Sequence, residues 1–379
     1  MSPVSLSLLG ILALFLSACA GSSSTPQPTP TSAPPTPTPS PTAEAPAVVF
    51  STPPRPLQLP QDDAPHRDPL EWWYYTGHLE ADGGRRYGFE FVIFQRLGQQ
   101  SQNGAAGYVG HFAITDLVRN RFVLAEKLNL APLPEEGGRG FALTLDGWSM
   151  TGFDGQDRIT ADLEGYRLDL SLKAAKPPVA HGTTGYIIVA EKENSYYYSR
   201  TRMQATGTLT VEGEAVPVRG LAWFDHQWGQ MTLAGSGGWD WFALTLEDGT
   251  EVMISIIRAA DGRRVAAYGT LVDAQGTAQH LPAEDLRVQN NGIWISPKTG
   301  AKYPMGWTVV LPKQGLDLTI TPDLMQQELD TSASTGVIYW EGKATVRGFQ
   351  QGIPMGGMAY VELTGYAPQP ARQGSRSAP

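Results

Sequence analysis

The chain has 379 residues, a formal net charge of −9 and a pI near 5.2. Nucleic-acid binding calls for a basic face, so this acidic balance argues against a nucleic-acid partner. The length exceeds that of one ordinary domain core and predicts two domains. Little 3.6-residue apolar periodicity is present, while Gly (42), Pro (30), Tyr (14) and Trp (10) are plentiful. This pattern favours sheets over helices.

The first segment contains the single cysteine, Cys19, so no internal disulfide can form. An apolar run precedes it, and Leu16-Ser17-Ala18-Cys19 resembles the lipobox of bacterial lipoproteins, whose cysteine becomes the acylated N-terminus. The run is too short to span a bilayer and is typical of a signal peptide, although the first seven residues lack the usual Lys or Arg. We therefore expect residues 1–19 to be a lipoprotein signal peptide. The folded part is then extracytoplasmic, lipid-anchored to the cell membrane in the periplasm or at the cell surface.

Residues 20–60 follow the cysteine and consist mostly of Ser, Thr, Pro, Gln and Ala over their first two thirds. A segment of this composition has little apolar surface to bury, so it predicts a disordered, polyproline-like tether. A loose tail is expected over residues 368–379.

From Glu71 onward, short apolar runs alternate with polar residues and are separated by turn residues. Such runs predict antiparallel strands and an all-β fold built as a barrel or sandwich. The expected strands of the first half include residues 87–94, 110–116, 121–128, 141–145, 158–163, 167–172, 186–191, 207–211 and 218–224.

The second half of the chain repeats the first. Residues 239–249 align with 72–83, and the closing residues 354–362 align without a gap with 217–225, so that Glu362 corresponds to Asp225. A period of about 140–165 residues indicates domain duplication. We expect two tandem antiparallel β-barrels, over residues 61–228 and 229–367.

Two segments concentrate aromatic and titratable side chains, residues 71–79 and 223–229. The aromatic rings alone are typical of a barrel core, but Glu71 and His78 are costly to bury without partners. Asp225 beside His226 is a candidate acid–base pair, because aromatic neighbours would raise the carboxyl pKa by desolvation. The alternative is that Asp225 braces the junction between the two domains, as Glu362 would in the second repeat.

Four motifs give the chain its resemblance to a known family: Glu71-Trp-Trp-Tyr-Tyr-Thr-Gly-His-Leu79, Trp223-Phe-Asp-His-Gln-Trp-Gly229, Tyr339-Trp-Glu-Gly342 and Tyr360-Val-Glu-Leu-Thr-Gly-Tyr366. The chain resembles the carotenoid 1,2-hydratases (hydroxyneurosporene hydratases) and their AttH-like relatives over residues 66–366. The resemblance implies two lipocalin-like barrels. It also implies addition of water, without a cofactor, to a carbon–carbon double bond of an apolar, isoprenoid-type substrate.

The resemblance also suggests roles for individual residues. A general acid protonates the alkene, aromatic rings stabilise the resulting cation, and a base takes the proton of the added water. The candidate catalytic residues are Asp225 as the acid, His226 as the water-handling group, and Glu71. The candidate substrate-binding residues are Trp72, Trp73, Tyr74, His78, Trp228, Trp239 and Trp241. The chain departs from the hydratases where they carry Tyr-x-Asp, because the corresponding region reads Val252-Met-Ile-Ser255.

Other kinds of site have little support in the sequence. The six histidines show no His-x-His or His-Glu-x-x-His spacing, so no metal site is predicted. No cofactor-binding motif is present either. The main alternative to an enzyme is a lipocalin-like carrier that holds an apolar lipid or pigment beside the membrane without changing it.

Overall fold

The computed structural model describes residues 49–50, 53–135, 137–190, 193–231 and 237–368. Cys19, the predicted signal peptide and most of the predicted tether and tail lie outside them. Within these ranges there is no α-helix, and no helix is long and apolar enough to cross a membrane. The short 3-10 helices are Gln61–Asp63, Asp82–Gly84, Gln99–Asn103, Ala283–Asp285 and Pro312–Gln314.

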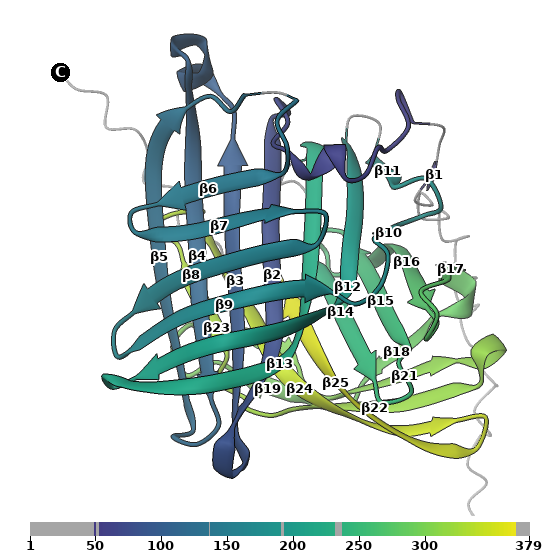
Figure 1. Cartoon of the computed structure of the whole chain (residues 1–379). Coiled ribbons are helices and arrows are strands. Elements are labelled where there is room, and N and C mark those ends of the chain that lie inside the picture. Colours follow the sequence, from purple (N-terminus) through teal and green to yellow (C-terminus); the bar gives the residue numbers. More distant parts are fainter. Residues whose placement is uncertain (1–48, 51–52, 136, 191–192, 232–236, 369–379) are drawn as a thin grey trace, which may run out of the picture. The chain divides into compact units, whose positions relative to one another are not determined.

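The first large sheet is antiparallel and contains the long strands from the first half of the chain (Figure 1). Along the sheet the order is β5 (Arg121–Pro132), β4 (Ala105–Asp116), β3 (Arg85–Arg96), β2 (Leu70–Ala81), β13 (Glu214–Gln230), β12 (Glu193–Val211), β9 (Tyr166–Ala174), β8 (Gln156–Leu163), β7 (Trp148–Phe153) and β6 (Phe141–Leu145). The short strands β1 (Val49–Phe50), β10 (Val179–Ala180) and β11 (Tyr186–Ala190) pair beside β12 or β11. The outermost strands β5 and β6 contact each other, which curls the sheet into a barrel-like form.

The second large sheet repeats this order with strands from the second half. It runs β17 (Ala278–Pro282), β16 (Arg264–Val272), β15 (Glu251–Arg258), β14 (Trp239–Leu246), β25 (Ile353–Leu363), β24 (Val337–Gln350), β22 (Leu316–Pro322), β21 (Trp307–Leu311) and β18 (Arg287–Asn290). Strand β23 (Glu328–Thr331) pairs with β24, and β19 (Ile293–Ile295) pairs with β20 (Lys302–Pro304) in a separate ribbon. The all-β, antiparallel fold class predicted from the sequence is confirmed.

The two sheets share one strand order, as a duplication requires. In the first sheet, the first strand, β2, lies between β3 and the closing strand β13; in the second, β14 lies between β15 and β25. The repeat read from the sequence aligned β2 with β14 and β13 with β25. In both sheets a carboxyl-bearing residue of the closing strand faces an aromatic residue of the first: Asp225 pairs with Tyr74, and Glu362 with Trp241.

Each sheet buries a separate apolar core on its concave face. Trp73, Tyr75 and Leu79 of β2 point into the core of the first sheet, because alternate residues of a strand share a face. Gly77 lies in the same row, and a Cβ there would come within 2.3 Å of the Phe89 ring. The Phe89 ring can therefore lie across β2 at this position only because residue 77 is a glycine. A second core, which includes Trp307 and Trp340, fills the second sheet.

A third buried cluster joins the outer faces of the two sheets. It contains Tyr74 and Trp223 from the first sheet, and Trp241, Met253 and Tyr360 from the second. These positions alternate with the core positions on the same strands. The central strands of both sheets are therefore covered on both faces, which explains their long apolar runs.

Candidate functional site

The unbroken course of β13 divides the predicted site residues into two groups. Strand β13 pairs continuously with β2 from Trp223 to Gly229, and with β12 from Phe224 to Gly229. Asp225 points toward the cluster between the sheets, where its partners are Ser199, Tyr197 and Trp223. His226 points to the opposite face, where it bonds to Glu71.

Asp225 and His226 therefore do not form the acid–base pair that the sequence suggested. The two side chains converge only if the strand ends or bulges between them, and it does neither. Gly229 does have a φ of 147°, in the region that favours glycine. It lies three residues beyond His226, however, and β13 continues to Gln230. One pocket shared by Asp225, His226 and Glu71 is thus excluded by the strand geometry.

The group between the sheets contains four carboxyl side chains, which we call the interface carboxyl cluster: Glu90 of β3, Asp225 of β13, Glu341 of β24 and Glu362 of β25. Glu90 and Glu341 are each 2% exposed, Asp225 is 4% exposed, and Glu362 is half-buried. Like charges in a dry interior repel one another, so such a cluster favours the protonated, neutral form of at least some of its members.

Asp225 is the member with the most hydrogen bonds. The phenol of Tyr197 donates to its Oδ2 at 2.6 Å, and the indole of Trp223 donates to its Oδ1 at 2.6 Å. The hydroxyl of Ser199 also donates to Oδ1. Burial raises the pKa of Asp225 to about 6, although these three donors act in the opposite direction. Asp225 is therefore a hydrogen-bonded carboxyl that ionises near neutral pH.

Glu90 has the opposite environment. Neither of its carboxyl oxygens has a hydrogen-bond partner among the described residues. Burial, and then the nearby Glu362, raise the pKa of Glu90 well above its ordinary value. Unpaired buried polar groups are rare in folded proteins and often belong to functional sites. Glu90 is thus a buried, unpaired carboxyl whose surroundings favour the protonated, neutral form.

The remaining two carboxyls are each bonded to an aromatic side chain. The Tyr74 phenol donates to Oε1 of Glu341 at 2.5 Å, and the Trp239 indole donates to Oε2 of Glu362 at 2.9 Å. Burial, followed by Glu90 and Glu362, raises the pKa of Glu341 well above its ordinary value. Burial raises the pKa of Glu362 to about 7. At neutral pH the cluster therefore contains protonated acids beside carboxyls that are partly ionised.

Aromatic rings surround these carboxyls. Tyr74 and Trp241 meet edge to face with centroids 5.5 Å apart, and Trp223 meets Trp241 in the same way at 5.9 Å. Trp72 and Trp239 are half-buried and pack against this apolar cluster. The faces of such rings attract a positive charge where water is excluded.

His78, a predicted binding residue, also lies on this side of β2. Its Nδ1 is 3.0 Å from Nζ of Lys343, and its ring packs against Tyr360 at 5.3 Å. Burial, and then the Lys343 charge, lower the pKa of His78 well below its ordinary value. His78 is therefore a neutral partner of the Lys343 ammonium and belongs to the contact between the sheets.

The second group lies at the core side of β2 and β13. Glu71 and His226 are fully buried; Trp73 stacks on the His226 ring with centroids 4.8 Å apart, and Trp228 packs against it in a tilted arrangement at 4.7 Å. His66 is also part of this group, because its Nδ1 is 2.8 Å from Oε1 of Glu71. These residues form a compact polar centre inside the first sheet.

Sequence reasoning missed Glu90, Glu341 and His66 as candidate site residues. A signal for the two glutamates was present, because each interrupts an apolar strand, in Phe89-Glu90-Phe91 and Trp340-Glu341-Gly342. A charged residue at such a position needs a partner or a purpose. His66 precedes β2 and carried no comparable signal.

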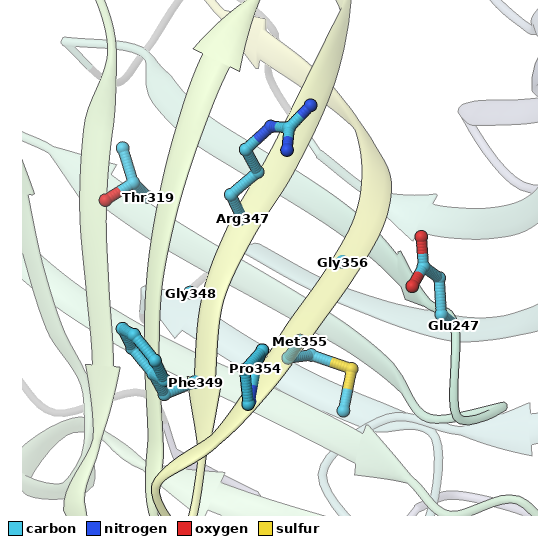
Figure 2. A pocket seen from close by; sticks show the side chains of 8 residues that line it. All are labelled: Glu247, Thr319, Arg347, Gly348, Phe349, Pro354, Met355 and Gly356. Atoms are coloured by element: carbon cyan, nitrogen blue, oxygen red, sulfur yellow. The ribbon is translucent and has the colours of Figure 1, made fainter.

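A surface pocket of about 510 Å³ lies elsewhere, over the β24–β25 hairpin of the second sheet. Figure 2 shows Phe349, Pro354 and Met355 on its lower side, with Arg347 and Glu247 at its edges. None of the interface carboxyls lines it. It is an open surface depression and offers no buried acid, so we do not assign the chemistry to it.

The fold and the buried acids together define a class: a duplicated, lipocalin-type β protein with titratable groups between its two sheets. A family model described as AttH-like matches residues 51–366. The chain belongs to this family.

Solved structures agree with this assignment. An AttH-type protein from Nitrosomonas europaea superposes with a TM-score of 0.74 at 31% identity, covering 83% of this chain and 99% of that one. Kievitone hydratase from Nectria haematococca superposes with a TM-score of 0.64, covering 82% of this chain and 93% of that one. At 16% identity, this second likeness concerns the fold alone.

A curated relative adds a chemical comparison. The dehydratase AsqC of Emericella nidulans is 25% identical over 214 residues, which is 54% of this chain. The match spans 60% of the length of that relative.

Proposed function

We propose that this protein is a cofactor-independent hydro-lyase that adds water to, or removes it from, a carbon–carbon double bond of an apolar substrate at the interface carboxyl cluster. The observation that carries the proposal is Glu90, a carboxyl that is buried without a hydrogen-bond partner between the two sheets, where burial favours its protonated form. The resemblance to a dehydratase in sequence supports the reaction class.

The acid step falls to Glu90. Protonating an alkene requires an acid that still holds its proton at neutral pH, and the Glu90 O–H has no acceptor among the described residues. The proton forms one new C–H bond and leaves a carbocation and the Glu90 carboxylate. Rings such as Trp241 and Tyr74 stabilise the cation through their faces, by about 1–2 kcal/mol each where water is excluded.

The base step falls to a partly ionised carboxyl. Asp225 and Glu362 have pKa values raised to about 6 and about 7, so a fraction of each is ionised at neutral pH. Either carboxylate accepts the proton that water loses when its oxygen bonds to the cation. Groups whose environments separate their pKa values in this way can serve as acid and base in one reaction. Transfer of that proton back to Glu90 closes the cycle, and the reverse sequence removes water.

The location of the protein is a further part of this proposal. The lipobox-like Leu16-Ser17-Ala18-Cys19 supports acylation at Cys19, and hence a site tethered to the extracytoplasmic face of a membrane. An apolar isoprenoid or lipid substrate would be available to the protein in that membrane. Mass spectrometry of the mature N-terminus tests this part. A diacylated or triacylated Cys19 is expected, and an unmodified thiol preceded by residues 1–18 would contradict it.

Oxygen-18 water tests the proposed reaction. The purified full chain is incubated with a panel of isoprenoid alkenes and the matching tertiary alcohols, and label in the products is measured by mass spectrometry. Wild type should incorporate one labelled oxygen per hydrated double bond, and Glu90→Gln should not. Glu80→Gln is the matched control, because Glu80 is an exposed carboxyl at the end of β2. A ligand that binds and is recovered unchanged would instead indicate a carrier.

A further inference from the structure

Three side chains far apart in the sequence direct their polar atoms at one point inside the first sheet. Nδ1 of His66 and Nε2 of His226 lie 2.8 and 2.7 Å from the same oxygen, Oε1 of Glu71. The three ligand-type atoms are all within 4.8 Å of one another. Glu71 and His226 are completely buried, while the side chain of His66 keeps 14% of its surface exposed.

When the His226 ring is neutral, the hydrogen bonds around it place no proton between its Nε2 and the Glu71 carboxylate. The Tyr198 phenol donates to the Asp63 carboxylate, so its oxygen can only accept from Nδ1 of His226, 3.3 Å away. A neutral imidazole with its proton on Nδ1 has a bare lone pair on Nε2. That lone pair faces a carboxylate oxygen at 2.7 Å. A positive charge between the two atoms is needed to hold them there.

His66 also directs a ring nitrogen at this carboxylate. Its Nδ1 faces Glu71, and its Nε2 is 3.5 Å from the Asp62 carboxylate. If Nε2 keeps the proton for Asp62, Nδ1 is also bare and faces the same Oε1. One cation at this point satisfies both histidine nitrogens and the carboxylate oxygen together.

We propose that His66, Glu71 and His226 bind one divalent transition-metal ion, for which Zn²⁺ is the best fit. Two imidazole nitrogens and one carboxylate oxygen form a donor set that Zn²⁺ takes in proteins, at about 2.0–2.2 Å from each ligand atom with an open position for water. On binding, the ion replaces any proton held between these atoms, and that proton passes to solvent. The partly exposed edge of His66 provides the route of entry.

The surroundings match those of a metal site. Each proposed ligand has an outer partner: Asp62 for His66, Tyr198 for His226, and the Gln95 amide, which donates to Oε2 of Glu71 at 3.2 Å. Outer partners of this kind fix the tautomer and orientation of the ligands. The ligands join the segment before β2 to β2 and β13, so the ion would also fasten that segment to the sheet.

This site is independent of the proposed hydro-lyase chemistry. Glu71 and His226 lie on the core face of their strands, whereas Asp225 and the other interface carboxyls lie on the opposite face. Loss of the metal and loss of turnover can therefore be observed separately.

The test uses the full chain, stripped with a chelator and titrated with Zn²⁺, with metal content measured by mass spectrometry and affinity by calorimetry. Wild type should bind one ion per chain. Glu71→Gln and His226→Asn should each weaken binding at least tenfold. His181→Asn is the matched control, because His181 is an equally buried histidine whose ring bonds to Thr270 and Ser199. It should bind as wild type does.

Two further measurements keep the proposal testable if the ligand variants fail to fold. Tyr198→Phe leaves all three proposed ligands in place, removes the outer partner of His226 together with the hydrogen bond to Asp63, and should weaken Zn²⁺ binding about 10–100-fold. Wild type loaded with Co²⁺ should show the visible absorption of a cobalt ion bound by nitrogen and oxygen. The proposal is overturned if stripped wild type takes up no ion, or if His181→Asn weakens binding as much as His226→Asn. The three side chains would then be a hydrogen-bonded brace with a proton at their centre.

Discussion

Asp225→Asn tests the electrostatics of the interface directly, because the variant keeps the shape of the side chain but cannot ionise. Burial raises the pKa of Asp225 from its ordinary value of 3.8 to about 6. A shift of about 2 pKa units corresponds to about 3 kcal/mol of unfolding free energy. Because the folded-state pKa is the higher one, this stabilisation is present below pH 4 and is lost as the pH rises through 6.

The assay is urea unfolding followed by tryptophan fluorescence at pH 4, 6 and 8. Wild type should lose stability over this range, and Asp225→Asn should lose about 3 kcal/mol less than wild type. At pH 4 the variant should be less stable by about 1 kcal/mol, because an amide nitrogen replaces the acceptor of the Tyr197 phenol. Asp317→Asn, at an exposed carboxyl, is the control and should leave the wild-type slope unchanged. Parallel pH curves for wild type and Asp225→Asn would refute this reasoning.

Four further outcomes are expected. Glu90→Gln should lower turnover 10²–10⁴-fold, the usual contribution of a general acid, with an unchanged or higher melting temperature in scanning calorimetry; a large loss of stability with full activity would contradict the role. Tyr74→Phe should lower the unfolding free energy by about 1 kcal/mol in urea titrations, because the hydrogen bond to Glu341 is lost. An unchanged unfolding free energy would show that this hydrogen bond does not contribute to stability. Trp241→Leu should slow the reaction about tenfold if its ring stabilises a cation by 1–2 kcal/mol, and an unchanged rate at saturating substrate would exclude this. Cys19→Ser should move the protein from the membrane fraction to the soluble fraction, and continued membrane association would contradict acylation at Cys19.

The fold class and the repeat could be predicted from the sequence because the signals for strands and turns are local and recur in both halves of the chain. Strand alternation is visible in runs such as Tyr87 to Phe94, and turn residues bound them. The correspondence of Asp225 with Glu362 indicated a duplication, and the two sheets indeed share one strand order. These features depend on neighbours along the chain, which a single sequence displays.

The site was harder to predict because its environment is made by contacts between distant segments. The position of Glu90 between Phe89 and Phe91 signals burial, but the local sequence does not show that strand β24 of the second sheet packs against β3. Asp225 and His226 are neighbours in sequence, but an unbroken strand sends them to opposite faces. His226 meets Glu71 across 155 residues of chain, so motif spacing could not bring the two together.

Measuring the ionisation state of Glu90 tests the central claim most directly. The claim is that a neutral carboxylic acid lies between the two sheets at neutral pH. Side-chain carboxyl carbons can be labelled with carbon-13 in Glu and followed by NMR through a pH titration, in wild type and in Glu90→Gln. We expect a protonated carboxyl signal that persists at pH 7 in wild type and is absent from the variant. If every Glu carboxyl of wild type titrates near the ordinary value of 4.5, the interface holds no neutral acid, and the proposed hydro-lyase mechanism is wrong.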